Sequence, residues 1–166
     1  RVLFRSNNPV EAVFFANKSS VADSIVIRET VFSDNRTDLV LMTEEKDNKG
    51  YYNAEHIVFS GNNVRQLQGR ILSVYRGGND ESTMGPSLKF TDNILNNCNS
   101  QPAAPLIHLY GVQQSLVAKN KFIHCNSNDI LLTIEDIVKA RHTLQENTIR
   151  LSGRVLKNEY TIELAN

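Results

Sequence analysis

The sequence predicts an all-β protein folded as a parallel β-helix, and three observations lead to that prediction. Asparagine recurs at Asn62, Asn93, Asn120 and Asn147, with spacings of 31, 27 and 27 residues, and Thr30 lies 32 residues before the first of them. Apolar residues stand at fixed offsets from each of these positions, and a second apolar run follows each one. A repeat of about 27 to 32 residues therefore covers most of the chain.

The apolar offsets are three residues before and two residues after each repeated position. The residues before are Ile27, Phe59, Phe90, Val117 and Leu144, and those after are Phe32, Val64, Leu95, Phe122 and Ile149. The second apolar runs are residues 39–41, 71–74, 106–109, 130–134 and, more weakly, 155–156. We expect each coil to contain a strand, a short turn, a second strand and a connection of variable length.

Stacking explains why such a unit is stable. A two-strand unit cannot bury both of its faces alone, but stacked units pair each strand with its counterpart about 4.8 Å away. A leucine-rich repeat needs a Leu-x-x-Leu-x-Leu signature, which is missing, and a propeller needs about four strands per unit. A β-sandwich gives no reason for asparagine to return in register.

The register has two consequences for polar side chains. Stacked asparagines at positions 62, 93, 120 and 147 are expected to hydrogen-bond to one another along the axis, which gives them a structural role. Cys98 and Cys125 both lie five residues past a repeated asparagine, so they should stack on adjacent coils. Their Cβ atoms would then lie about 4.8 Å apart, wider than the roughly 3.8 Å of a disulfide, so stacked free thiols are expected over a bridge.

Length and charge limit the classes of protein. The 166 residues fit a single domain, 1–166, and the equal numbers of basic and acidic residues, 18 each, create no overall field for nucleic acid or a membrane. The four histidines show no metal-ligand spacing. The sequence begins at Arg1 inside an apolar run, which we interpret as a processed or truncated product with another segment before it.

Three long segments follow second strands in this register: residues 5–20, 43–52 and 75–86. Residues 1–4 would then occupy the second-strand position of a first coil, and the three segments would lie along one edge. Candidate residues for substrate binding or an interdomain junction on that edge are Arg5, Tyr75, Arg76, Asn79, Asp80 and Glu81. In such a segment the arginine could bind an acidic sugar and the carboxylates could bind a cation. Alternatively, the arginine forms ion pairs with the carboxylates of its own loop and holds the loop in one conformation.

The stretch from Leu72 to Pro86 resembles a segment in the C-terminal β-helix of two-domain alginate lyases of polysaccharide lyase family six, relatives of chondroitinase B. The resemblance is sharpest over about residues 53 to 125. It implies a right-handed parallel β-helix and a periplasmic or extracellular protein that acts on alginate or a related uronic-acid polysaccharide by β-elimination. In that family a Ca²⁺ ion neutralises the substrate carboxylate, a lysine removes the C5 proton and an arginine assists the departing oxygen.

The resemblance also implies that catalysis and structural support belong to different domains. The family's metal ligands include a Glu-x-Glu pair, which this sequence lacks, and its catalytic groups lie in the N-terminal domain. This chain therefore corresponds to the C-terminal supporting half, with no catalytic residue, metal ligand or cofactor of its own. Its expected partners are the N-terminal catalytic β-helix domain and an acidic polysaccharide, and a homodimer is left open.

Two other functions are compatible with the sequence. The edge carrying Arg5, Arg76, Asp80 and Glu81 could itself be a lyase or hydrolase site, which Ca²⁺-dependent activity would favour. The β-helix could instead be a carbohydrate-binding or adhesion module, which would bind oligosaccharides without turnover.

Overall fold

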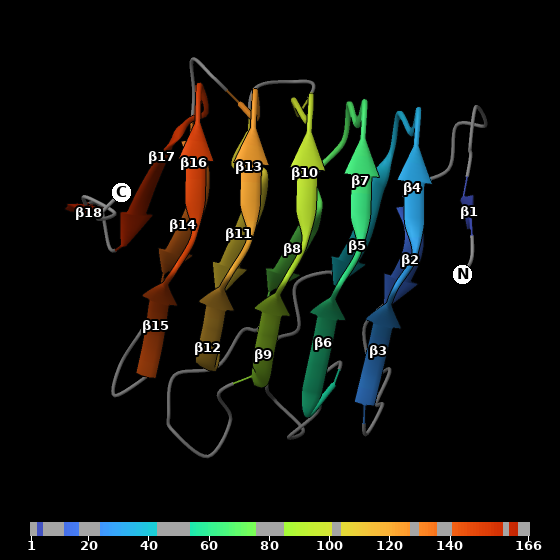
Figure 1. Ribbon diagram of the computed structural model, residues 1–166. Coiled ribbons are helices and arrows are strands. Elements are labelled where there is room, and N and C mark those ends of the chain that lie inside the picture. The colour runs from blue at the N-terminus through green and yellow to red at the C-terminus, as the bar shows by residue number, and fades with distance from the viewer. Residues whose placement is uncertain are drawn as a thin grey trace.

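The protein is described by a computed structural model that covers residues 3–4, 12–16, 24–42, 54–75, 85–100, 104–126, 130–135, 141–157 and 160–162. These residues form strands and turns without a helix, and the strands build three parallel sheets that wrap around one core (Figure 1). The predicted parallel β-helix is confirmed. No helix long and apolar enough to cross a membrane occurs in this part of the chain.

Each complete coil contributes one strand to each sheet. Sheet C contains β3 (Ser24–Arg28), β6 (His56–Ser60), β9 (Gly85–Thr91), β12 (Val112–Ala118) and β15 (Arg141–Gln145). Sheet A contains β1 (Leu3–Phe4), β4 (Val31–Ser33), β7 (Asn63–Arg65), β10 (Ile94–Asn96), β13 (Lys121–Ile123) and β16 (Thr148–Arg150). Sheet B contains β2 (Ala12–Ala16), β5 (Asp38–Met42), β8 (Leu72–Tyr75), β11 (Ile107–Tyr110), β14 (Ile130–Glu135), β17 (Arg154–Lys157) and β18 (Tyr160–Ile162).

The chain passes from sheet C around a bend into sheet A, turns into sheet B and returns to sheet C in the next coil, so that the coil is right-handed (Figure 1). Neighbouring strands are parallel throughout, apart from β18, which pairs antiparallel with β17 at one edge of sheet B. The predicted second strands are the sheet B strands. Identical offsets pair with one another, as with Val64, Leu95 and Phe122 in sheet A.

The predicted first strand is wrong in one respect, because the structure divides it into two strands at the repeated asparagine. The residue before each repeated position has a positive φ: Glu29 (49°), Gly61 (66°), Asp92 (59°), Lys119 (58°) and Glu146 (53°). This left-handed conformation bends the chain from sheet C into sheet A. In a continuous strand, residues five apart would point to opposite faces. The bend lets both apolar offsets face the core.

The core is continuous along the axis and contains a stack of aromatic rings. The centroids of Phe32 and Phe59 are 6.0 Å apart, those of Phe59 and Phe90 are 5.2 Å apart, and those of Phe90 and Phe122 are 6.3 Å apart. All four rings are at most 2% exposed. Burial of these rings and of the aliphatic rows above and below them supplies the main driving force for stacking the coils.

The first coil differs from the prediction. Leu3 and Phe4 pair with Val31 and Phe32 in sheet A, whereas residues 1–4 were expected in the second-strand position, which is sheet B. Residues 5–11 therefore connect a sheet A strand to the sheet B strand β2. Residues 43–55 and 76–84, in contrast, connect sheet B to sheet C. The alignment of residues 5–20 with the other two segments is wrong, because β2 lies inside that range.

Candidate functional site

Most of the predicted site residues lie outside the described part of the chain: Arg5, Arg76, Asn79, Asp80 and Glu81. Tyr75 is the last residue of β8, and its backbone pairs with that of Tyr110, which in turn pairs with Glu135. The stretch from Tyr75 to Pro86 thus leaves sheet B at Tyr75 and enters sheet C at Gly85. Tyr75 and Gly85–Pro86 thus belong to strands, and the residues between them connect sheet B to sheet C.

The four asparagines form the hydrogen-bonded ladder that their spacing predicts. In Asn93, the side-chain oxygen accepts a hydrogen bond from the Asn62 backbone N–H at 2.9 Å and another from the Asn62 amide at 3.1 Å. Its Nδ2 donates to the Asn120 Oδ1 at 2.9 Å and to the Phe59 carbonyl at 3.0 Å. The same pattern continues to Asn147. All these buried polar groups are satisfied, so the ladder is a rigid structural element of the bend.

A pair of opposite charges joins two coils beside the outer face of sheet B, where Asp38 begins β5 and Arg70 lies in the turn before β8. The Arg70 Nη2 and Nε donate to the Asp38 Oδ2 at 2.7 and 2.8 Å, and the Arg70 backbone N–H donates to Oδ1 at 2.7 Å. The Arg70 Nη1 reaches the Ser73 hydroxyl at 3.1 Å. A guanidinium bonded in this way is fixed in orientation while part of it remains exposed.

A second pair lies farther along the same face. The His108 Nε2 is 3.3 Å from the Glu135 Oε1, and both side chains are partly exposed. Ser73, His108 and Thr133 follow one another in register, so the three polar side chains form a row across three coils.

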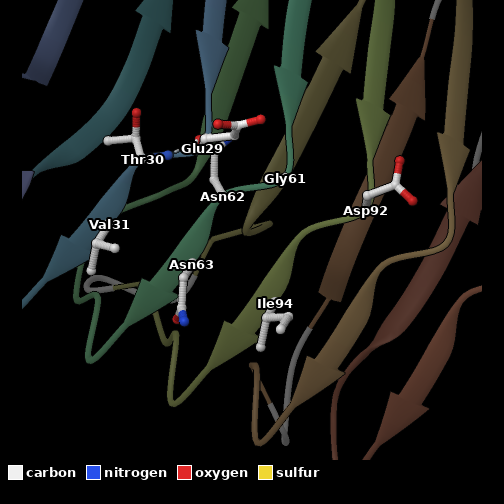
Figure 2. A pocket seen from close by; sticks show the side chains of 8 residues that line it. All are labelled: Glu29, Thr30, Val31, Gly61, Asn62, Asn63, Asp92 and Ile94. Atoms are coloured by element: carbon white, nitrogen blue, oxygen red, sulfur yellow. Dashed lines mark hydrogen bonds between the residues drawn. The ribbon is translucent and has the colours of Figure 1, made fainter. Parts of the chain in front are cut away.

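A groove of about 300 Å³ lies at the bend between sheets C and A (Figure 2). Its lining comes from three consecutive coils: Glu29, Thr30, Val31, Gly61, Asn62, Asn63, Asp92 and Ile94. Figure 2 shows Gly61 between the side chains of Glu29 and Asp92, and a parallel row in which Asn63 stands between Val31 and Ile94. Each flanking coil thus contributes one carboxylate and one apolar side chain.

Gly61 opens this groove. The equivalent residues in the other coils of the described chain, Glu29, Asp92, Lys119 and Glu146, all carry long or charged side chains in the same left-handed conformation. A Cβ atom at Gly61 would stand 3.7 Å from the Glu29 Cγ, so the Glu29 side chain lies at van der Waals distance from the vacant position. The groove therefore exists because one side chain is missing from an otherwise charged row.

Sequence reasoning did not find the groove, the Asp38–Arg70 pair or a hydrogen bond between the Ser115 Oγ and the His142 Nδ1, which are 2.7 Å apart. Gly61, one residue before Asn62 where other coils have charged residues, was the available signal for the groove.

Of the lysines, Lys89 and Lys121 are exposed on strands, and Lys119 lies at the bend, 4.0 Å from Glu146. The described residues contain no group of three or more His, Cys, Asp or Glu placed to hold a metal ion.

Comparisons with known proteins add no family assignment. Neither a scan against protein-family models nor a search of curated proteins found a match to this chain.

Proposed function

We propose that this β-helix is the non-catalytic, supporting part of a polysaccharide lyase that acts on alginate or a related uronic-acid polymer, with the catalytic residues in another part of the protein. The family resemblance of residues 72–86 suggests the substrate class. The parallel β-helix is compatible with that resemblance, and a stack of coils offers a long, rigid support for a neighbouring catalytic part.

The observation that carries the proposal is the pairing of charges on the outer face of sheet B. Arg70 is held by two contacts from its guanidinium to Asp38, and His108 lies beside Glu135. Each pair joins adjacent coils, so the orientations of these charged side chains on the face are fixed. A partly exposed arginine still offers hydrogen-bond donors in a fixed fork, a geometry that suits carboxylates. This face is therefore the proposed contact with the uronate chain.

Affinity electrophoresis tests the contact. We expect the purified chain to migrate more slowly in gels that contain alginate or another polyuronate than in gels without polymer. Arg70→Gln should weaken the retardation, because it removes the charge and two donors from the sheet B face. Arg28→Gln is the matched control, because Arg28 is an exposed arginine at the end of β3 in sheet C.

Folding of each variant is checked by circular dichroism, and His108→Gln provides a second change on the same face. A chain that is not retarded in any polyuronate gel would contradict the proposed contact. Equal losses for Arg28→Gln and for the two sheet B variants would also contradict it, since the effect would then reflect total charge.

A further inference from the structure

We propose that the groove at the bend between sheets C and A binds an amine-bearing sugar, namely one pyranose unit with a free ammonium group. This inference concerns a different face from the sheet B contact and does not depend on it. The site consists of the carboxylates of Glu29 and Asp92, the apolar side chains of Val31 and Ile94, and the amide of Asn63.

The size of the groove limits its occupant. A volume of about 300 Å³ lies at the lower end of the range for small-molecule sites, and it suits one sugar ring better than a larger ligand. Glu29 and Asp92 lie on coils on either side of Gly61, so their backbones are about 10 Å apart, twice the spacing of neighbouring strands. A ring placed over Gly61 would have a carboxylate at each end.

The apolar row gives the ring a surface to lie on. Ile94 is 43% exposed, one of three large aliphatic side chains that are exposed among the described residues, and Val31 is half-buried two coils away. Between them, the Asn63 carbonyl oxygen accepts a hydrogen bond from the Arg65 Nε at 2.9 Å. That bond occupies the oxygen end of the amide and leaves its NH₂ end as a donor toward a ligand hydroxyl.

Charge selects the chemistry of the ligand. The groove is lined by two carboxylates and by no basic side chain, so a uronate would be repelled and a cation attracted. A carboxylate also accepts hydrogen bonds from hydroxyl groups, which holds the far side of the ring. An amino sugar with a free amine satisfies both requirements, because it brings one positive charge and several hydroxyl donors.

The framework beneath the groove is rigid. The Asn62 backbone N–H and amide both bond to Asn93, and the Gly61 N–H donates to the Thr91 carbonyl at 3.0 Å. The backbone at the base of the groove is therefore already fixed before a ligand arrives, which lowers the entropic cost of binding.

Isothermal titration with short oligomers of de-N-acetylated glucosamine tests this site. We expect binding that weakens as salt is added, and much weaker binding of the N-acetylated oligomer of the same length and of oligouronates. Glu29→Gln and Asp92→Asn should each weaken binding about tenfold, the loss of one charge-assisted hydrogen bond. Glu146→Gln, the same kind of change in the same row but outside the groove, should leave the affinity unchanged.

Gly61→Asn gives an independent check, because asparagine tolerates a positive φ and its side chain would fill the groove without adding charge. We expect it to abolish binding while the fold is retained. The proposal is overturned if the de-N-acetylated oligomer does not bind, if the N-acetylated oligomer binds equally well, or if Glu146→Gln weakens binding as much as Glu29→Gln.

Discussion

Asn93 shows how much one residue contributes to the stacking of the coils. Its side chain is fully buried, and it takes part in four hydrogen bonds that reach the coils on both sides. Removing it would leave donors of Asn62 and the Phe59 carbonyl without partners inside the protein. The cost of an unsatisfied buried group, about 1–3 kcal/mol, exceeds the benefit of forming a hydrogen bond in the first place.

Asn93→Ala should therefore lower the free energy of unfolding by about 3–5 kcal/mol, more than Asn147→Ala. Asn147 has the same offset, but it is only half-buried, so water can replace part of its bonding. Urea unfolding followed by circular dichroism measures both variants. A loss for Asn147→Ala that equals or exceeds the loss for Asn93→Ala would contradict the ladder as the source of the stability.

Gly69 is a second residue whose identity is set by a close contact between coils. A Cβ atom there would lie 2.2 Å from the Thr37 carbonyl carbon and 2.3 Å from the Thr37 oxygen, which are backbone atoms of the preceding coil. Gly61 differs, because a Cβ atom there has room and only the positive φ opposes it.

Gly69→Ala should cost about 3 kcal/mol or more, because two backbones must move apart, whereas Gly61→Ala should cost about 1 kcal/mol. Thermal unfolding of the two variants beside the unmodified chain gives the comparison. The close approach of the coils at Thr37 would be refuted by equal stabilities of the two alanine variants.

At the scale of elements, the turn after sheet A places Cys98 and Cys125 on neighbouring coils as buried free thiols. The Cys125 thiol donates to the Leu95 carbonyl at 3.5 Å, and the Cys98 thiol to the Val64 carbonyl at 3.7 Å. The hydrogen bond with the Cys125 thiol, together with burial, raises the pKa of Cys98 well above its usual value. The folded protein thus keeps the Cys98 proton at pH values where the unfolded chain loses it.

This difference makes stability depend on pH in a defined direction. The contribution of Cys98 is fully present below the thiol pKa of the unfolded chain, about 8.5, and is lost as the pH rises through the folded pKa. Cys98→Ser does not titrate in that range. The same contact lowers the pKa of Cys125, which offsets part of this loss, but the shift of Cys98 is the larger one. The stability advantage of the unmodified chain over Cys98→Ser should therefore shrink between pH 7 and pH 10 in urea unfolding, and an advantage that grows with pH would contradict the raised pKa.

Two elements show what the sequence could and could not predict. The sheet B strands and the ladder followed from offsets to Asn62 and its counterparts, because stacking forces identical positions into contact. The division of the first strand at each repeated position was missed, because in four of the five coils the left-handed conformation falls on a residue other than glycine: Glu29, Asp92, Lys119 and Glu146. The groove was missed because it results from the absence of a side chain at Gly61, and a pattern of apolar and polar residues does not reveal an empty space.

At the scale of the whole molecule, the coils form a single rigid stack with distinct outer faces. The sheet B face carries charges that are paired across coils, and the bend between sheets C and A carries an acidic groove. The first suits a supporting and polysaccharide-contacting role, and the second suits a cationic sugar. Neither role requires the chain itself to break a glycosidic bond.

The central claim, that this chain supports a lyase without being the catalyst, is tested most directly by the formation of unsaturated uronate. The purified chain is incubated with alginate and related polyuronates, with and without Ca²⁺, and the ultraviolet absorbance of the unsaturated product is followed. The account predicts no product under any of these conditions. Product formation that is lost in Arg70→Gln or in Arg76→Ala would contradict it, because the catalytic site would then lie on this chain.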